Sequence, residues 1–181
     1  MPRPSLFSFC FGPVGKWRVA SMQAVVGPAL PPAERLAVRE GAFGDHAGLV
    51  LRGVTSNARY SKRSELDALA AKQEGLGRLG ATCAALIPIR KSEAWWALAQ
   101  DERRAIMEER SRHIAIGLEY LPGVARRLHH CRELGEAFDF LTWFEYPPEH
   151  AEAFDDLVRR LRATEEWAHV EHEVDIRLSR A

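Results

Sequence analysis

Two neighbouring segments with alternating side chains constrain the fold of this chain most. Residues 124–131 and 138–146 each alternate, and the polar residues 132–136 between them are typical of a turn. They predict an antiparallel pair of strands. One face of the pair carries an arginine, a histidine and a series of mainly apolar side chains, namely Arg126, Leu128, His130, Phe138, Phe140, Thr142 and Phe144. With His113 shortly before the pair, this face predicts an enclosed pocket suited to a metal cofactor.

The segment before this pair predicts a strand followed by a helix. Residues 82–89 form a nearly continuous apolar run, and Pro88 indicates a sheet edge or a strand end. Ser92 is expected to cap a helix, and Asp101 to cap its continuation to about Ile116. His113 would then lie near the end of a helical run.

The segment after the pair predicts another helix and a last strand. Behind Pro147 and Pro148, apolar residues recur at the spacing of one buried helical face, namely Phe154, Leu157, Val158 and Leu161. Residues 170–178 alternate between apolar and charged, which predicts a strand with one face buried and the other in water. From residue 82 the order is β, α, β, β, α, β, which is that of a ferredoxin-like unit.

The first half of the chain indicates a shortened copy of the same arrangement. Residues 5–12, 16–26 and 48–55 predict strands, whereas residues 34–39 are too short to assign. Ser61 or Ser64 is expected to cap a helix that continues to about residue 74. We therefore expect an α+β protein with two halves, residues 1–78 and 79–181, that share one continuous sheet.

Composition excludes several classes of protein. Lysine plus arginine equals aspartate plus glutamate at 25 each, so nothing favours nucleic acid or an anionic membrane as a partner. The three cysteines are far apart and form no CxxC pair, so we expect buried thiols and a non-covalent cofactor. No apolar run approaches the ~20 residues of a membrane span. The weakly signal-like N-terminus is interpreted as a first strand, which implies a cytoplasmic protein.

His113 is the first candidate for chemistry. It shares a helical face with Ile106 and Gly117, and a lone histidine on an apolar face is most often an ordinary core residue. Lys91, the pair Trp95-Trp96 and the pair Glu165-Glu166 favour a functional role for it. A ligating histidine needs an acceptor for its other ring nitrogen, and a carboxylate such as Glu166 provides one.

Arg126 is the second candidate. It alternates with Arg127, so one of the two faces inward, and parity alone does not choose between them. A buried guanidinium needs an anionic partner, so Arg126 on the inside implies an anionic ligand or substrate. The Thr142 hydroxyl also needs a partner if it is buried. The remaining histidines of this half that we considered, His129, His130, His169 and His172, are interpreted as structural or exposed.

Motifs along the whole chain resemble the chlorite dismutase family, in particular its short, dimeric branch. The motifs are LFSF from Leu6, Trp17-Arg18-Val19, Arg59-Tyr60, SEAWWAL from Ser92, RRLHHCRELGEAFDFLTWFE from Arg126, and LRATEEW from Leu161. The long, pentameric members have a full-length first half, which this chain lacks. The resemblance implies a homodimer of the dimeric α+β barrel type, with two fused ferredoxin-like units of which the first is truncated.

The resemblance also implies a haem b site in the second unit. It places the proximal iron ligand at His113, hydrogen-bonded to Glu166, with Lys91 in the same network. Arg126 matches the distal arginine and would be the catalytic residue. Further pocket residues implied in this way are Tyr60 and Trp95 near the haem edge and propionates, Trp96 nearer the subunit contact, and Leu128, Thr142 and Phe144 around the distal side.

The implied function is that of a haem b-dependent chlorite dismutase, or chlorite O2-lyase. Chlorite would be converted to chloride and dioxygen through ferryl haem and a transient hypochlorite that Arg126 retains. Coproheme decarboxylases share the fold and the histidine, but they are longer and lack this arginine. A peroxidase and a non-catalytic haem-binding or sensing protein also remain possible. So does a haem-free barrel in which His113 is only part of the core.

Overall fold

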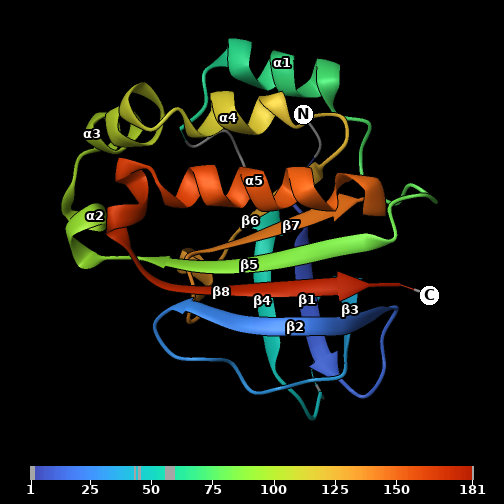
Figure 1. Ribbon diagram of the computed structural model, residues 1–181. Helices are drawn as coiled ribbons and strands as arrows, with labels where there is room; N and C mark the ends of the chain where they lie inside the picture. The colour runs from blue at the N-terminus through green and yellow to red at the C-terminus, as the bar shows by residue number, and fades with distance from the viewer. Residues whose placement is uncertain (1–2, 43, 45, 56–59, 181) are drawn as a thin grey trace.

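The strands of this protein close into a barrel that is covered by helices on one side (Figure 1). The computed structural model describes residues 3–42, 44, 46–55 and 60–180, and Arg59 of the Arg59-Tyr60 motif lies outside them. The strands of the described residues are β1 (Leu6–Gly12), β2 (Trp17–Val26), β3 (Arg35–Glu40), β4 (Val50–Thr55), β5 (Cys83–Lys91), β6 (Ala125–His130), β7 (Phe140–Tyr146) and β8 (Val170–Ser179). They are hydrogen-bonded in the order β1-β3-β2-β8-β5-β7-β6-β4, and every pair, including β4 with β1, is antiparallel.

The two halves of the barrel have the same strand order. Around the barrel the order of strands is β4-β1-β3-β2 in the first half and β8-β5-β7-β6 in the second half. If the four strands of each half are numbered along the chain, both halves therefore have the spatial order 4-1-3-2. The halves are joined where β2 pairs with β8 and where β4 pairs with β6. From β5 onward, the elements follow the predicted order of strands and helices.

The short segment that the sequence left unassigned is a full member of the barrel. β3 lies between β1 and β2 and pairs with β1 from Phe7 opposite Glu40 to Gly12 opposite Arg35. The strand has charged residues at both ends and only three apolar residues between them, so its own alternation is weak. Its structure depends on the neighbouring strands that take up its backbone hydrogen bonds.

Helices cover the outer face of the second half of the sheet (Figure 1). The helices of the described residues are α1 (Arg63–Lys72), α2 (Glu93–Ala97), α3 (Gln100–Arg104), the π-helix η1 (Ala105–Arg110), α4 (His113–Glu119), α5 (Ala151–Arg162) and the short 3₁₀ helices η2 (Arg132–Leu134), η3 (Pro148–His150) and η4 (Glu165–His169). Of these, η2 forms the turn between β6 and β7. The buried face of α5 is the predicted one. The cap of α1 was predicted wrongly, because Lys62 is the N-cap and Glu65 accepts its backbone N–H. In the described part of the chain, no helix is long and apolar enough to cross a membrane.

Apolar side chains form two cores on opposite faces of the sheet. One fills the barrel and includes Phe9, Trp17 and Trp143. The other lies between sheet and helices and includes Phe144 and Phe154. All three cysteines are free thiols, and burial raises the pKa of each.

Two predictions about the strands were wrong because the sheet has no open edge and its outer face is covered. Pro88 was expected at an edge or a strand end, yet β5 pairs with β7 on one side and β8 on the other, and Pro88 lies opposite Leu141. The charged face of β8 was expected in water, yet Glu173 and Asp175 are buried. The helix-covered side of the barrel therefore holds charged groups that alternation alone assigns to solvent.

Inside the barrel, His129 is a buried histidine held in its neutral form. Its Nδ1 donates to the Leu141 carbonyl at 3.0 Å, and its Nε2 accepts from Arg127 Nε at 3.0 Å. The rings of Phe7 and Phe9 contact it edge-on. Burial lowers its pKa to about 4, although the bond to the Leu141 carbonyl acts in the opposite direction.

We predict that His129 makes the protein sensitive to acid. Its pKa is about 6.5 in an unfolded chain, so the unfolded state takes up a proton first as the pH falls. The stabilising contribution is complete above pH about 6.5 and is lost as the pH falls toward about 4, a total loss of about 3 kcal/mol. Urea unfolding of wild type and His129→Gln at several pH values checks this, with His150→Gln as control. The wild-type advantage should shrink across this pH range, and a constant advantage would contradict the prediction.

Candidate functional site

The helix that carries His113 begins at that residue. The continuous helical run predicted up to about residue 116 is wrong, and so is the cap at Asp101, because Ala99 is the N-cap of α3. After η1 the chain turns at Arg112, which has a left-handed backbone with φ of 54°. Glu108 then accepts hydrogen bonds from the backbone N–H groups of Ile114 and Ala115 and so caps the new helix. His113 is thereby placed in the first turn of α4, and Gly117 lies inside the same helix.

His113, Glu166 and Lys91 form one hydrogen-bonded group. The Nδ1 atom of His113 lies 2.6 Å from Glu166 Oε2, and Lys91 Nζ donates to Glu166 Oε1 at 2.8 Å. The side chains of Lys91 and Glu166 are almost fully buried, whereas that of His113 is 32% exposed. The Nδ1 atom is thus occupied, and the Nε2 edge is available on the more open side of the ring.

The charge of Glu166 is stabilised by its surroundings. Burial alone would raise its pKa, but the nearby charges of His113 and Lys91, together with their hydrogen bonds, lower it to about 2. Its backbone N–H donates to the Ser111 hydroxyl at 3.0 Å, which attaches η4 to the chain just before α4. The carboxylate therefore stays ionised and acts as a fixed acceptor for the imidazole.

The predicted aromatic residues lie around Lys91, but not all in the same way. Lys91 Nζ lies 4.4 Å from the ring centroid of Trp95, and the Tyr60 ring contacts Trp95 edge-on. The indole N–H of Trp95 is buried without a hydrogen-bond partner among the described residues. Trp96 points away from this group, because its indole N–H donates to Asp139 at 3.0 Å and its ring stacks on Phe140.

Arg126 lies on the helix side of the sheet, which answers the question that strand parity left open. Its guanidinium packs on α4, because a Cβ added at Gly117 would lie 1.8 Å from Arg126 Nη1. Burial lowers the pKa of Arg126 to about 10, with the charge of Glu108 acting in the opposite direction. No described residue accepts a hydrogen bond from this guanidinium. Arg127 instead points into the barrel, where it bonds His129 and covers the Phe7 ring.

His113 and Arg126 approach the same side of α4 from different elements. Gly117 follows His113 by four residues, so the two lie on one face of the helix. The other predicted pocket residues are neighbours of Arg126 in the sheet, since it lies opposite Phe144 and Leu128 lies opposite Thr142. Phe144 is buried and Leu128 is 38% exposed.

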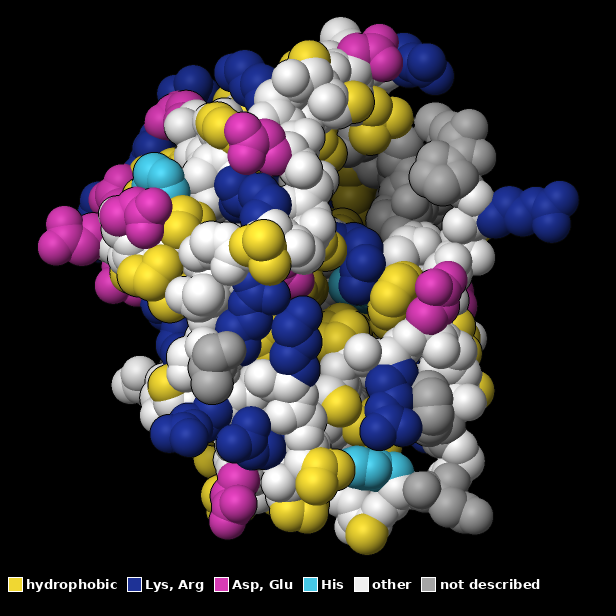
Figure 2. All heavy atoms as spheres, turned by 90° about the vertical axis from the view of Figure 1, so that its right-hand side faces the viewer, with side chains coloured by type: hydrophobic (Ala, Val, Ile, Leu, Met, Phe, Trp, Pro, Cys, Tyr) yellow, Lys and Arg dark blue, Asp and Glu magenta, His cyan; other side chains and the backbone are white. Residues whose placement is uncertain are grey.

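The side of the molecule at the right of Figure 1 is hollowed. Figure 2 shows hydrophobic side chains at the floor of a hollow in its upper half and lysine or arginine side chains near its lower rim. Positive side chains around an apolar hollow attract anions to it.

Several residues around the site were not singled out from the sequence. Trp167 lies against the His113 ring with 6.1 Å between centroids, and Asp139 accepts from the Lys91 backbone N–H at 2.7 Å. Glu108 caps α4 and lies close enough to Arg126 to influence its charge. The ion pairs and caps could not be read from alternation, although the position of Trp167 next to Glu166 was a usable signal.

The fold is thus a helix-covered antiparallel barrel with a hydrogen-bonded group of histidine, carboxylate and lysine beside α4. An arginine with no acceptor among the described residues packs on the same helix. The family model for chlorite dismutase matches residues 38–181. A crystal structure of dimeric chlorite dismutases from Nitrobacter winogradskyi is similar, with 57% sequence identity, 96% of this chain and 99% of that chain covered, and a TM-score of 0.90.

A second similar structure is a variant of the chlorite dismutase from Candidatus Nitrospira defluvii. It has 30% identity and a TM-score of 0.60, and the match covers 80% of this chain and 56% of that chain. The chain therefore belongs to the chlorite dismutase family. The resemblance inferred from the sequence motifs is confirmed.

We predict that the buried pair of Lys91 and Glu166 is far more important for stability than its exposed neighbour. Removing Lys91 leaves a buried carboxylate with one partner fewer, which costs about 3–5 kcal/mol. Next to Lys91 in β5, Arg90 forms an ion pair at 3.0 Å with Glu171 of β8, and the side chains of this pair are 45% and 44% exposed. Such exposed pairs contribute about 0–1 kcal/mol. Denaturant unfolding of Lys91→Met and Arg90→Met measures both. Equal losses would contradict this assignment.

Proposed function

We propose that this protein is a haem b-dependent chlorite dismutase that converts chlorite to chloride and dioxygen. The observation that carries the proposal is the half-buried guanidinium of Arg126, which lies on the same face of α4 as His113 and donates to no described residue. A cation that is partly withdrawn from water and has no acceptor is costly, so this position favours an anion. Membership of the chlorite dismutase family supports chlorite as that anion.

The residues present fit a haem group. His113 has its Nδ1 atom hydrogen-bonded to Glu166, which is the arrangement that fixes an imidazole for ligation through Nε2. The buried indole N–H of Trp95 has no partner among the described residues and is suited to donate to a haem carboxylate. Tyr60 and Trp95 would lie near the haem edge, with Leu128, Thr142 and Phe144 around the other face, and Trp96 nearer the subunit contact.

Haem, when bound, supplies the redox chemistry that breaks the chlorine–oxygen bonds and joins the two oxygen atoms. The protein supplies charge and orientation. Arg126 would bind the chlorite anion through its guanidinium charge and would retain the hypochlorite formed from it. Glu166, itself held by Lys91, accepts from Nδ1 of His113 and fixes the direction of the imidazole ring. Phe144 keeps the wall beside Arg126 apolar, which strengthens the attraction between guanidinium and anion.

We also propose that the two halves, residues 1–78 and 79–181, are ferredoxin-like units, the first of them truncated, and that the chain forms a homodimer. The shared strand order of the two halves supports the first statement. The similar protein from Nitrobacter winogradskyi, described as dimeric, supports the second. The cytoplasmic location expected from the sequence stays a prediction.

The proposed function predicts oxygen release. Protein reconstituted with haem and given chlorite should release one dioxygen for each chlorite consumed, as measured with an oxygen electrode. His113→Ala should lose haem on gel filtration, because the iron then has no ligand from the protein, and it should release no oxygen. A wild-type protein that retains haem but releases no oxygen would contradict the function, and peroxidase and decarboxylase assays would then show which related activity it has.

A second prediction concerns the role of Arg126. In Arg126→Ala the hypochlorite is no longer held by a positive charge, so more of it should escape and bleach the haem after fewer turnovers. A hypochlorite scavenger should extend the activity of the variant more than that of wild type. Arg127→Ala is the matched control, because this neighbouring arginine points into the barrel. Wild-type turnover number and chlorite affinity in Arg126→Ala would argue against the assignment.

A further inference from the structure

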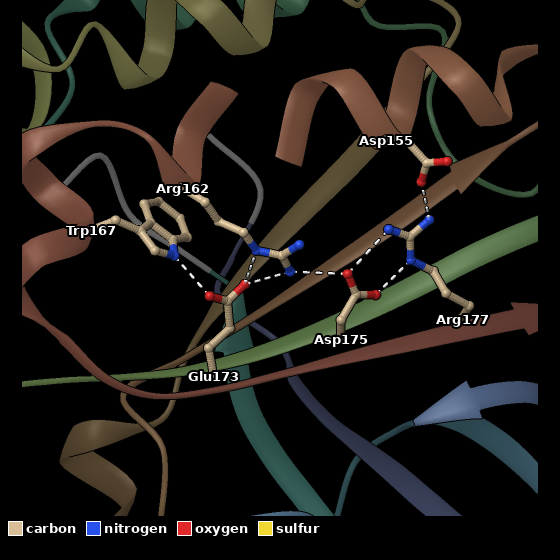
Figure 3. A network of polar contacts seen from close by, with 6 residues as sticks. All are labelled: Asp155, Arg162, Trp167, Glu173, Asp175 and Arg177. Atoms are coloured by element: carbon tan, nitrogen blue, oxygen red, sulfur yellow. Dashed lines mark hydrogen bonds and ion pairs between the residues drawn. The ribbon is translucent and has the colours of Figure 1, made fainter. Parts of the chain in front are cut away.

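A network of charged side chains links β8 to α5, with buried carboxylates at its centre and the exposed Asp155 at one end (Figure 3). Arg162 of α5 contacts Oε1 of Glu173 with two nitrogens, Nε at 2.8 Å and Nη2 at 2.7 Å. Its Nη2 also donates to Asp175 at 2.9 Å. Arg177 binds Asp175 at 2.5 Å and Asp155 at 2.6 Å. Glu173 is fully buried. The network therefore fixes the position of one carboxylate, that of Glu173, from two elements.

The free oxygen of Glu173 holds Trp167. The indole N–H of Trp167 donates to Glu173 Oε2 at 2.8 Å, and Figure 3 shows the ring on the side of Glu173 away from Asp175. Trp167 directly follows Glu166 in η4. A 3₁₀ helix has three residues per turn, so successive side chains point in directions well apart. The turn can thus present two different groups to His113.

Those two groups meet the imidazole in different ways. Glu166 binds the edge of the ring at Nδ1, at 2.6 Å. Trp167 lies against the face of the ring, with 6.1 Å between the centroids and 29° between the planes. The ring is attached through Cβ, so it can change its plane while keeping Nδ1 near Glu166 only by coupled rotation about its two side-chain bonds. A flat neighbour whose own plane is fixed restricts this adjustment.

We infer that Trp167 is a positioning residue that sets the rotational orientation of the His113 imidazole, with Glu173 and Arg162 as its anchor. The inference rests on the proposed function, in which His113 is the haem ligand. The plane of an axial imidazole determines which haem orbitals it overlaps. Trp167 thereby defines the electronic asymmetry of the haem, in addition to the ligand basicity that Glu166 provides.

The energetics of the network agree with a positioning role. Replacing buried ion pairs by apolar side chains of similar volume often leaves the free energy of unfolding unchanged or raises it. A contribution to stability is therefore a weak explanation for this network. Its charged hydrogen bonds are short and directional, which suits the exact placement of one aromatic plane. Lys91 Nζ lies 5.4 Å from the Trp167 ring centroid and contacts the same ring.

The test compares Trp167→Phe with Trp167→Leu in haem-reconstituted protein bound to cyanide. Both variants fill the space with apolar atoms, but only phenylalanine is flat. The readout is the spread of the haem-methyl resonances in the proton NMR spectrum, which reports the orientation of the imidazole plane. We expect Trp167→Phe to keep nearly the wild-type spread and Trp167→Leu to change it, with haem content unchanged. Trp17→Phe in the barrel is the control for loss of an indole.

A wild-type spread in Trp167→Leu would overturn the inference. If that variant does not fold, Glu173→Gln decides, because it keeps the ring but weakens its anchor. We expect broader or shifted methyl resonances in Glu173→Gln, and an unchanged spectrum would equally overturn the inference. The outcome is separable from the proposed function, since a haem-loaded protein that releases no oxygen from chlorite still reports the orientation of His113. Failure of the wild type to take up haem would overturn both.

Discussion

The buried carboxylate of Glu166 is the constraint on which the site depends. An ionised carboxylate without partners is very costly in a dry interior, and this one is compensated by Lys91 from β5 and His113 from α4. The three residues come from a strand, a helix and a turn that are distant in sequence. Once the barrel brings β5 and η4 together, the charge of Glu166 can be accommodated only where both partners are within hydrogen-bonding distance. The position of α4 over the sheet is therefore coupled to this single group.

Closure of the barrel separates the structural role of the sheet from its functional role. Because no strand has an open edge in the described barrel, its backbone ladders are satisfied and the interior is free to fill with aromatic side chains. Arg127 points into that interior, where it donates a hydrogen bond to His129 and lies over the Phe7 ring. Arg126, one residue earlier, points to the helices and has no acceptor among the described residues. Two adjacent arginines thus have opposite roles because strand side chains alternate between two very different environments.

The sequence allowed much of the second half to be predicted, because its periodic segments are long and their faces are clear. The strand pair around Arg126 and the buried face of α5 are confirmed by the structure. The wet face of β8 was wrong, because alternation records polarity and cannot reveal that α5 brings Arg162 to pair with the carboxylates. The break at Arg112 was also missed, since it depends on Glu108 capping a helix that starts later in the chain.

Site residues were harder to predict than the fold, because their roles depend on direction and on partners. Parity could not choose between Arg126 and Arg127, and the resemblance to a known family made the choice that the structure supports.

The polar groups between sheet and helices differ in whether the protein supplies them with hydrogen-bond partners. Glu166 and Glu173 each accept hydrogen bonds from several protein donors, so both carboxylates are compensated within the protein. The Trp95 indole N–H is buried without such a partner, and no described residue accepts from the half-buried Arg126 guanidinium. Under the proposed function, an anionic ligand would accept hydrogen bonds from these two donors.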